Sequence, residues 1–188
     1  MKKLFLILII GLLALSSCKK DDDIEVENNK VKFVPTDVIV KTRGYYTIDK
    51  VFEFINLLNL NVESIRCNAY TSTLPSDSLN YILKYLNAKT YTHDGEQWYV
   101  TGYLHYATGV ITIFPKLFDI NNKDNQADWF HSIDFLHLTE VTDKEVSGNT
   151  IYFHVPIGQE KDWVEKFENY AFVEWAELNY IVELNPWP

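Results

Sequence analysis

The chain has 188 residues, of which 47% are hydrophobic and 15% aromatic, and its formal net charge at pH 7 is −9. An acidic surface repels the phosphate backbone of nucleic acids, so we expect no nucleic-acid partner. The length suits one domain or two small domains that pack together.

Residues 1–17 have the pattern of a bacterial lipoprotein signal peptide. Lys2 and Lys3 form a basic start, and an apolar run from Leu4 to Leu15 follows. This run is too short to cross the hydrocarbon core of a bilayer, which is about 30 Å thick, so it indicates a segment that is removed. The sequence Leu15-Ser16-Ser17-Cys18 resembles a lipobox, in which the cysteine thiol accepts a diacylglycerol.

The lipobox resemblance implies that Cys18 carries acyl chains, such as palmitate, that anchor the protein in a membrane. Residues 18–30 are mostly polar and acidic, and we interpret them as a flexible tether. Lys19 stands where an aspartate often retains a lipoprotein at the inner membrane, and Asp21-Asp22-Asp23 resembles the export signal of surface lipoproteins. We expect an outer-membrane lipoprotein, and the sequence leaves open whether it faces the periplasm or the cell surface.

Residues 31–108 predict strands and two helices. Residues 38–40 predict a strand, Thr47 is the expected N-cap of a first helix, and residues 62–65 alternate as a strand. A second helix is predicted to begin at Pro75-Ser76-Asp77. From residue 98 to residue 118 the pattern favours strands, with Gly109 in a tight turn.

Residues 109–188 predict the order βαββαβ. A third helix follows the loop 119–124, and a fourth covers residues 159–170. The strands 138–146 and 150–155 flank Ser147-Gly148-Asn149, which predicts a hairpin, and a last strand covers residues 172–184. This order is the one found in the ferredoxin-like plait.

The predicted fold class is α+β, with antiparallel sheet packed by helices in one or two ferredoxin-like plaits. Two arrangements fit the element order. We favour two tandem units, residues 31–108 and 109–188, because the alternative, one plait with a long insertion, must give residues 76–148 a core of their own. Once Cys18 is lipidated, Cys67 is the remaining cysteine, so we expect a buried thiol without a disulfide and a monomeric protein.

The segment from Phe172 to Ile181 resembles the end of the propeptides of subtilisin-like proteases, which commonly read V-E-Y-A-E-P-N, although Leu178 replaces the proline. Residues 38–65 and 150–169 correspond to other elements of that family. The resemblance implies a plait that inhibits a protease by placing its C-terminal tail in the active-site cleft. The candidate binding residues of the tail are then Glu183, Leu184, Asn185, Pro186 and Trp187.

We find no catalytic, zinc-binding or phosphate-binding motif, and therefore predict no enzyme activity, no metal and no cofactor. Residues 119–125 begin like a calcium loop, but Lys123 occupies the fifth position and glycine is missing from the sixth.

Tyr99, Tyr103 and His105 alternate on one face of a predicted strand. These side chains form either an exposed platform that stacks against a sugar or peptide, or an ordinary cross-strand cluster, which we favour. The sequence as a whole thus predicts a lipid-anchored, non-enzymatic binding module with a protein partner. The alternative is a free-standing inhibitor of a subtilisin-like serine protease.

Overall fold

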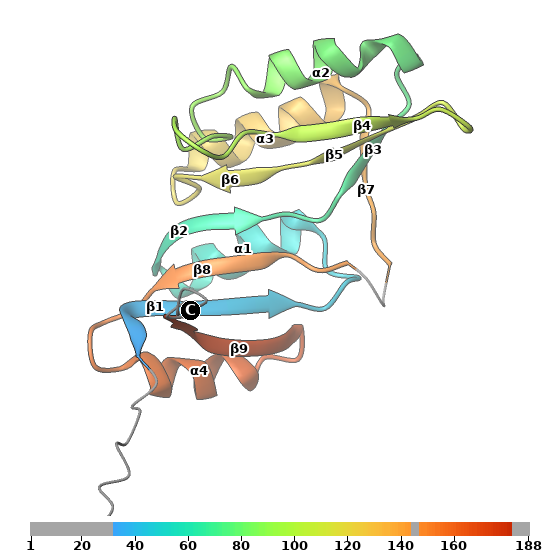
Figure 1. Cartoon of the computed structure of the whole chain (residues 1–188). Helices are drawn as coiled ribbons and strands as arrows, with labels where there is room; N and C mark the ends of the chain where they lie inside the picture. Colours follow the sequence, from blue (N-terminus) through green and yellow to red (C-terminus); the bar gives the residue numbers. More distant parts are fainter. Residues whose placement is uncertain (1–31, 144–146, 182–188) are drawn as a thin grey trace, which may run out of the picture. The chain divides into compact units, whose positions relative to one another are not determined.

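A computed structural model describes residues 32–143 and 147–181 of the chain (Figure 1). This part contains four α-helices and two antiparallel sheets, which confirms the predicted α+β class. The helices are α1 (Ile48–Leu58), α2 (Leu79–Leu86), α3 (Lys123–Phe135) and α4 (Glu160–Glu168), and a 3-10 turn (Ser76–Ser78) precedes α2.

The first sheet has five strands in the order β6-β2-β8-β1-β9, and the second has four in the order β4-β5-β3-β7. The five strands are β1 (Phe33–Thr42), β2 (Asn61–Arg66), β6 (Lys116–Phe118), β8 (Thr150–His154) and β9 (Val173–Tyr180). The four strands are β3 (Tyr70–Ser72), β4 (Thr101–His105), β5 (Val110–Phe114) and β7 (Leu138–Glu140).

The five-stranded sheet combines strands from both ends of the chain. Strand β1 pairs on one side with β8 and on the other with β9. The order β2-β8-β1-β9, with α1 between β1 and β2 and α4 between β8 and β9, is that of a ferredoxin-like plait. The boundary predicted at residue 108 therefore separates β1 from its partners, and the pairing follows the arrangement of one plait with a long insertion.

Helices α1 and α4 cover one face of the five-stranded sheet. Phe54 of α1 and Phe167 of α4 both contact Phe153 of β8, with ring centroids 6.0 and 4.8 Å from it. Thr47 lies at the extended N-cap of α1, as predicted, and the helix ends at Asn59, whose φ of 52° is left-handed. The buried aromatic cluster holds both helices against the sheet.

The inserted segment has a core of its own. Trp129 of α3 is fully buried, and its ring lies edge-on to that of Tyr70 in β3, with centroids 5.6 Å apart. Ile82 of α2 and Ile113 of β5 are also fully buried. Trp98 and Trp175, in contrast, are partly exposed.

A bent two-stranded ribbon joins the two sheets. Strand β2 continues into β3 through residues 67–69, and β5 continues into β6 through Pro115. The two long strands pair along their length, with Arg66 opposite Lys116 in one sheet and Tyr70 opposite Ile113 in the other. Because both sheets share this ribbon, their faces meet at its bend.

The predicted hairpin around Ser147-Gly148-Asn149 is wrong. Strand β7 pairs with β3 in the four-stranded sheet, whereas β8 pairs with β1 and β2 in the other. The Asn149 side chain accepts a hydrogen bond from the Asn68 N–H at 3.1 Å and donates one to the Tyr46 carbonyl at 3.0 Å. These residues therefore hold the chain where it passes from the four-stranded sheet to the five-stranded sheet. Turn-forming residue types suit this connection as well as a hairpin.

In the part of the chain that the structure describes, we find no helix whose length and apolarity would let it cross a membrane. The proposed signal peptide and Cys18 lie outside the described residues.

Candidate binding groove on the open sheet face

Three cationic residues form a row across the five-stranded sheet. Arg66 of β2 is the register partner of both Lys116 of β6 and Thr150 of β8, and Thr150 in turn is opposite Lys41 of β1. Residues directly opposite one another in a sheet point to the same side. Because the neighbours of these residues along their strands, such as Val40, are buried under the helices, the row faces away from the helices.

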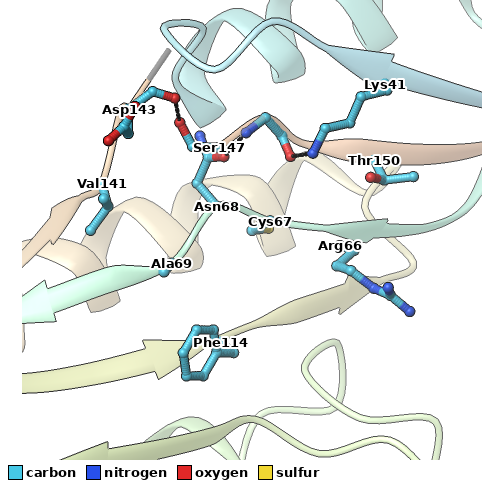
Figure 2. A pocket seen from close by; sticks show the side chains of 11 residues that line it. Lys41, Arg66, Cys67, Asn68, Ala69, Phe114, Val141, Asp143, Ser147 and Thr150 are labelled. Atoms are coloured by element: carbon cyan, nitrogen blue, oxygen red, sulfur yellow. Dashed lines mark hydrogen bonds between the residues drawn. The ribbon is translucent and has the colours of Figure 1, made fainter. Parts of the chain in front are cut away.

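Two adjoining pockets lie where this open face meets that of the four-stranded sheet. The first, of about 480 Å³, is lined by Lys41, Arg66 and Thr150 from one sheet and by Phe114, Val141 and the acidic Asp143 from the other side (Figure 2). The second, of about 410 Å³, shares Arg66, Cys67 and Phe114 with the first and adds Trp98, Tyr99 and Lys116. We call the two pockets together the junction groove.

The cations of the junction groove lie against aromatic rings. The Arg66 guanidinium is 5.7 Å from the centroid of the Trp98 ring, and the Lys116 ammonium is 4.7 Å from the same centroid. Lys116 also lies 5.5 Å from the ring centroid of Tyr152. Contacts of this kind orient the cations, but they neutralise no charge.

Burial changes the titration of both lysines. It is the main cause that lowers the pKa of Lys116 below its ordinary value, against the opposing charges of Glu63 and Asp94, and the positive charge of Arg66 adds to the lowering. Burial likewise lowers the pKa of Lys41, against a smaller opposing effect of Glu174. Lys41 donates a hydrogen bond to the Gly148 carbonyl (Figure 2). Within residues 32–143 and 147–181, none of the three cations forms an ion pair.

Tyr99, Tyr103 and His105, the candidate platform residues, each pack against a different partner. Tyr103 and His105 point to the open side of β4, and the Tyr103 ring stacks on Phe114 with centroids 5.8 Å apart. Tyr99 precedes β4, lines the second pocket and stacks on His93 at 5.4 Å. The His105 ring is 3.0 Å from the Thr108 hydroxyl, in the turn that contains Gly109. Tyr99 and Tyr103 therefore belong near the groove, whereas His105 belongs to the turn.

Of the other residues predicted from the sequence, Cys67 lines both pockets of the groove, whereas the rest lie outside the described residues. Glu183, Leu184, Asn185, Pro186 and Trp187 lie outside the described residues, as does Cys18. Cys67 is buried, and burial raises the pKa of its thiol well above the ordinary value. The buried thiol without a disulfide that the sequence predicts is thus confirmed.

The sequence did not single out Lys41, Arg66, Lys116 or Phe114. Each lies on a different strand, and no local motif connects them. The available signal is alternation, which assigns each residue to the face of its strand opposite the core. Their grouping follows only from the strand pairing.

Asp37, Glu63 and His154 form a second group of polar residues, whose ligand atoms lie within 4.8 Å of one another. These are the described residues that could hold a divalent cation. Asp37, however, already accepts hydrogen bonds from Asn179 and Thr36 and lies 3.0 Å from the His154 ring. The Asp37 carboxylate thus connects three strands of the sheet.

Glu140 is a partly buried carboxylate between the two sheets. It accepts hydrogen bonds from the Ile48 N–H at the start of α1, at 2.9 Å, and from the Asn68 amide, at 2.7 Å. Burial is the main cause that raises the pKa of Glu140. The hydrogen bonds assign it to the junction of the inserted segment with the plait.

Comparison of the chain with known protein families, with curated proteins and with solved structures gave no match. We therefore infer function from the geometry of the junction groove and from the sequence.

Proposed function

We propose that the protein is a lipid-anchored, non-enzymatic binding module of the outer membrane that holds an anionic ligand in the junction groove. The observation that carries this proposal is the row of Lys41, Arg66 and Lys116, three cations that form no ion pair with another described residue and lie beside exposed aromatic rings. A groove of this composition offers charge pairing and apolar contact to the same ligand. Among the described residues that line the groove, we find no nucleophile hydrogen-bonded to a side-chain base, which supports binding rather than catalysis.

The anchoring part of the proposal is tested at Cys18. Replacing Cys18 with alanine removes the acceptor of the lipid, so we expect the precursor to stay unprocessed and the protein to leave the outer-membrane fraction. Cell fractionation and intact-mass measurement report both effects. An unmodified Cys18 in the wild-type protein contradicts the anchor.

The binding part is tested with residues 19–188, which omit the signal and the lipid. A panel of acidic peptides, acidic oligosaccharides and their neutral counterparts is screened for ligands that raise the melting temperature. A ligand of the groove stabilises the wild type and loses this effect with Arg66→Ala. Lys161→Ala is the matched control, because Lys161 is an exposed cation on α4. A panel without any hit, or hits unaffected by Arg66→Ala, refutes groove binding.

Inhibition of a subtilisin-like serine protease is a second proposal. It is supported by the strand order β2-β8-β1-β9, which is the plait that the resemblance of residues 172–181 implies. The test is titration of residues 19–188 against subtilisin-like proteases from the same cell, with and without residues 183–188. Loss of inhibition on removal of the tail is the expected result. Inhibition that persists without the tail contradicts a tail in the cleft, and the absence of inhibition at micromolar concentration refutes this proposal.

A further inference from the structure

The geometry of the junction groove points to an acidic oligosaccharide, a chain of sugar rings that carry carboxylates, as its ligand. This inference rests on the proposed function and names the class of ligand that the groove takes.

The charges of the groove fit carboxylates spaced along a chain. Neighbouring strands in a sheet are about 4.8 Å apart. The register therefore separates the backbone of Arg66 from that of Lys116 by about 5 Å, and from that of Lys41, two strands away, by about 10 Å. One row thus offers positive charge at both of its ends, where successive carboxylates of an extended ligand can pair. An anion in the groove also offsets the desolvation that lowers the pKa of Lys41 and Lys116.

The aromatic rings beside the cations keep exposed surface, although Arg66 and Lys116 contact Trp98 and the rings of Tyr103 and Phe114 stack on each other. Trp98, Tyr103 and Phe114 are 43%, 49% and 45% exposed. A sugar ring presents an apolar face of C–H groups that packs on such flat rings, while its hydroxyl groups point outward to polar neighbours. Thr101 and Gln97 beside Trp98, and Thr150 beside Arg66, supply those neighbours.

The backbone at the floor of the groove disfavours a peptide. A peptide strand needs free backbone N–H and C=O groups, which a sheet edge offers. Here the Cys67 N–H donates to the Pro115 carbonyl at 3.1 Å, and the Ala69 carbonyl accepts from the Val141 N–H at 2.8 Å. The Asn68 N–H is bonded to the Asn149 side chain. Recognition in the groove therefore uses side chains, which suits a ligand whose polar groups surround its ring.

The overall charge disfavours a dense polyanion. The net charge of −9 repels a nucleic acid, whose affinity depends on many phosphate contacts. A uronic acid chain has a lower charge density than a nucleic acid duplex, so three cations in one row are enough to pair with its carboxylates.

The test is isothermal titration calorimetry with residues 19–188 and three kinds of hexameric probe. The acidic probes are hexamers of galacturonate, mannuronate and glucuronate, and the matched neutral probe of each is its methyl ester, which keeps the ring and removes the charge. Hexaglutamate is the acidic peptide. We expect at least one acidic hexamer to bind, with an affinity at least about tenfold above that of its ester, because charge-assisted hydrogen bonds are lost on esterification.

Variants locate the binding. Arg66→Ala and Lys116→Ala are each expected to lower the affinity for the acidic hexamer by about tenfold, whereas Lys161→Ala should leave this affinity unchanged. Trp98→Ala should weaken it as well, and Trp98→Phe should restore most of the affinity because it keeps a flat ring. Circular dichroism and the melting temperature of each variant verify that it is folded.

Three results overturn the inference. Equal affinity for every acid and its ester excludes carboxylate recognition. Hexaglutamate binding as tightly as the best sugar, with the same loss in Arg66→Ala, identifies an acidic peptide ligand and leaves the proposed function standing. No measurable binding of any sugar probe at millimolar concentration refutes the oligosaccharide, and hits from the separate thermal screen then decide whether groove binding itself survives.

Discussion

The two faces of the five-stranded sheet differ sharply, although the same strands supply both. Toward α1 and α4 the strands present Val40, Ile65 and Phe153, all fully or almost fully buried. Toward the other side they present Lys41 and Arg66, with Lys116 next to them. Successive residues of one strand therefore place their side chains alternately in the core and on the groove side, because side chains alternate between the faces of a sheet.

The difference separates the face that contributes most to stability from the face to which we assign the proposed binding. The helical face removes apolar side chains from water, which is the main favourable contribution to folding. The open face instead holds lysines whose pKa is lowered by burial, so their charged forms are less stable there than in water. The open face is therefore the face on which we place the proposed ligand.

The largest contrast is expected between two neighbours on β8. Phe153→Ala empties a fully packed site between α1 and α4 and should lower the free energy of unfolding by about 3–5 kcal/mol. Tyr152→Ala, on the open face, should cost about 1 kcal/mol or less. Urea denaturation measures both values. Equal losses would mean that the open face is packed as a second core.

A second contrast concerns two glycines with positive φ. At Gly148 (φ 137°) an added Cβ lies 2.2 Å from the Thr42 carbonyl oxygen, so Gly148→Ala must move the backbone that borders the groove at Lys41. We expect a loss of about 2–3 kcal/mol in unfolding free energy. Gly109→Ala is the control, because Gly109 (φ 73°) has open space around it and should lose only about 1 kcal/mol. Similar losses in both would show that strain, and not the close approach, decides the effect.

A third, smaller effect concerns pH and Glu140, at the junction of the sheets. Its pKa is raised in the folded protein, so the folded state takes up a proton at higher pH than the unfolded state. The resulting stabilisation is full below the ordinary pKa of 4.5 and is lost as the pH rises through the folded pKa.

Comparison of the wild type with Glu140→Gln isolates this contribution from that of carboxylates such as Asp128, whose pKa is lowered and which therefore lose stabilisation in acid. As the pH falls toward 4.5, the free energy of unfolding of the wild type should rise by on the order of 1 kcal/mol relative to that of Glu140→Gln. Chemical denaturation at several pH values measures it. A difference that does not change with pH would contradict the burial of the carboxylate.

Local structure was predictable because it depends on neighbours in sequence. Thr47 before a helical repeat predicted the start of α1, and Gly109 predicted the turn between β4 and β5. Alternation likewise predicted β9 and the α+β class. The partners of the strands were not predictable in this way, because β1 pairs with strands from the other end of the chain.

The candidate site was predictable only where it is local. Tyr99 and Tyr103 were recognised because they occur in one aromatic segment, and both lie at or beside the groove. Arg66 and Lys116 are brought together by the pairing of β2 with β6. Singly, each has the pattern of an ordinary exposed cation, and the sequence carries no signal for their common row.

The smallest expected effect tests whether the lysines of the open face hold the ligand by charge. Because the pKa of Lys41 and of Lys116 is lowered, both lose their protons at a lower pH than an ordinary lysine, whose pKa is 10.5. The affinity for an acidic hexasaccharide should therefore fall a few-fold between pH 8 and 10, whereas the carboxylates of the sugar stay ionised throughout. Arginine keeps its proton over this range, so the double variant Lys41→Arg/Lys116→Arg should bind with an affinity that changes little with pH. Calorimetric titration at each pH gives the two profiles. Parallel profiles for the wild type and the double variant would show that these lysines do not supply the charge, and would assign that part to Arg66 alone.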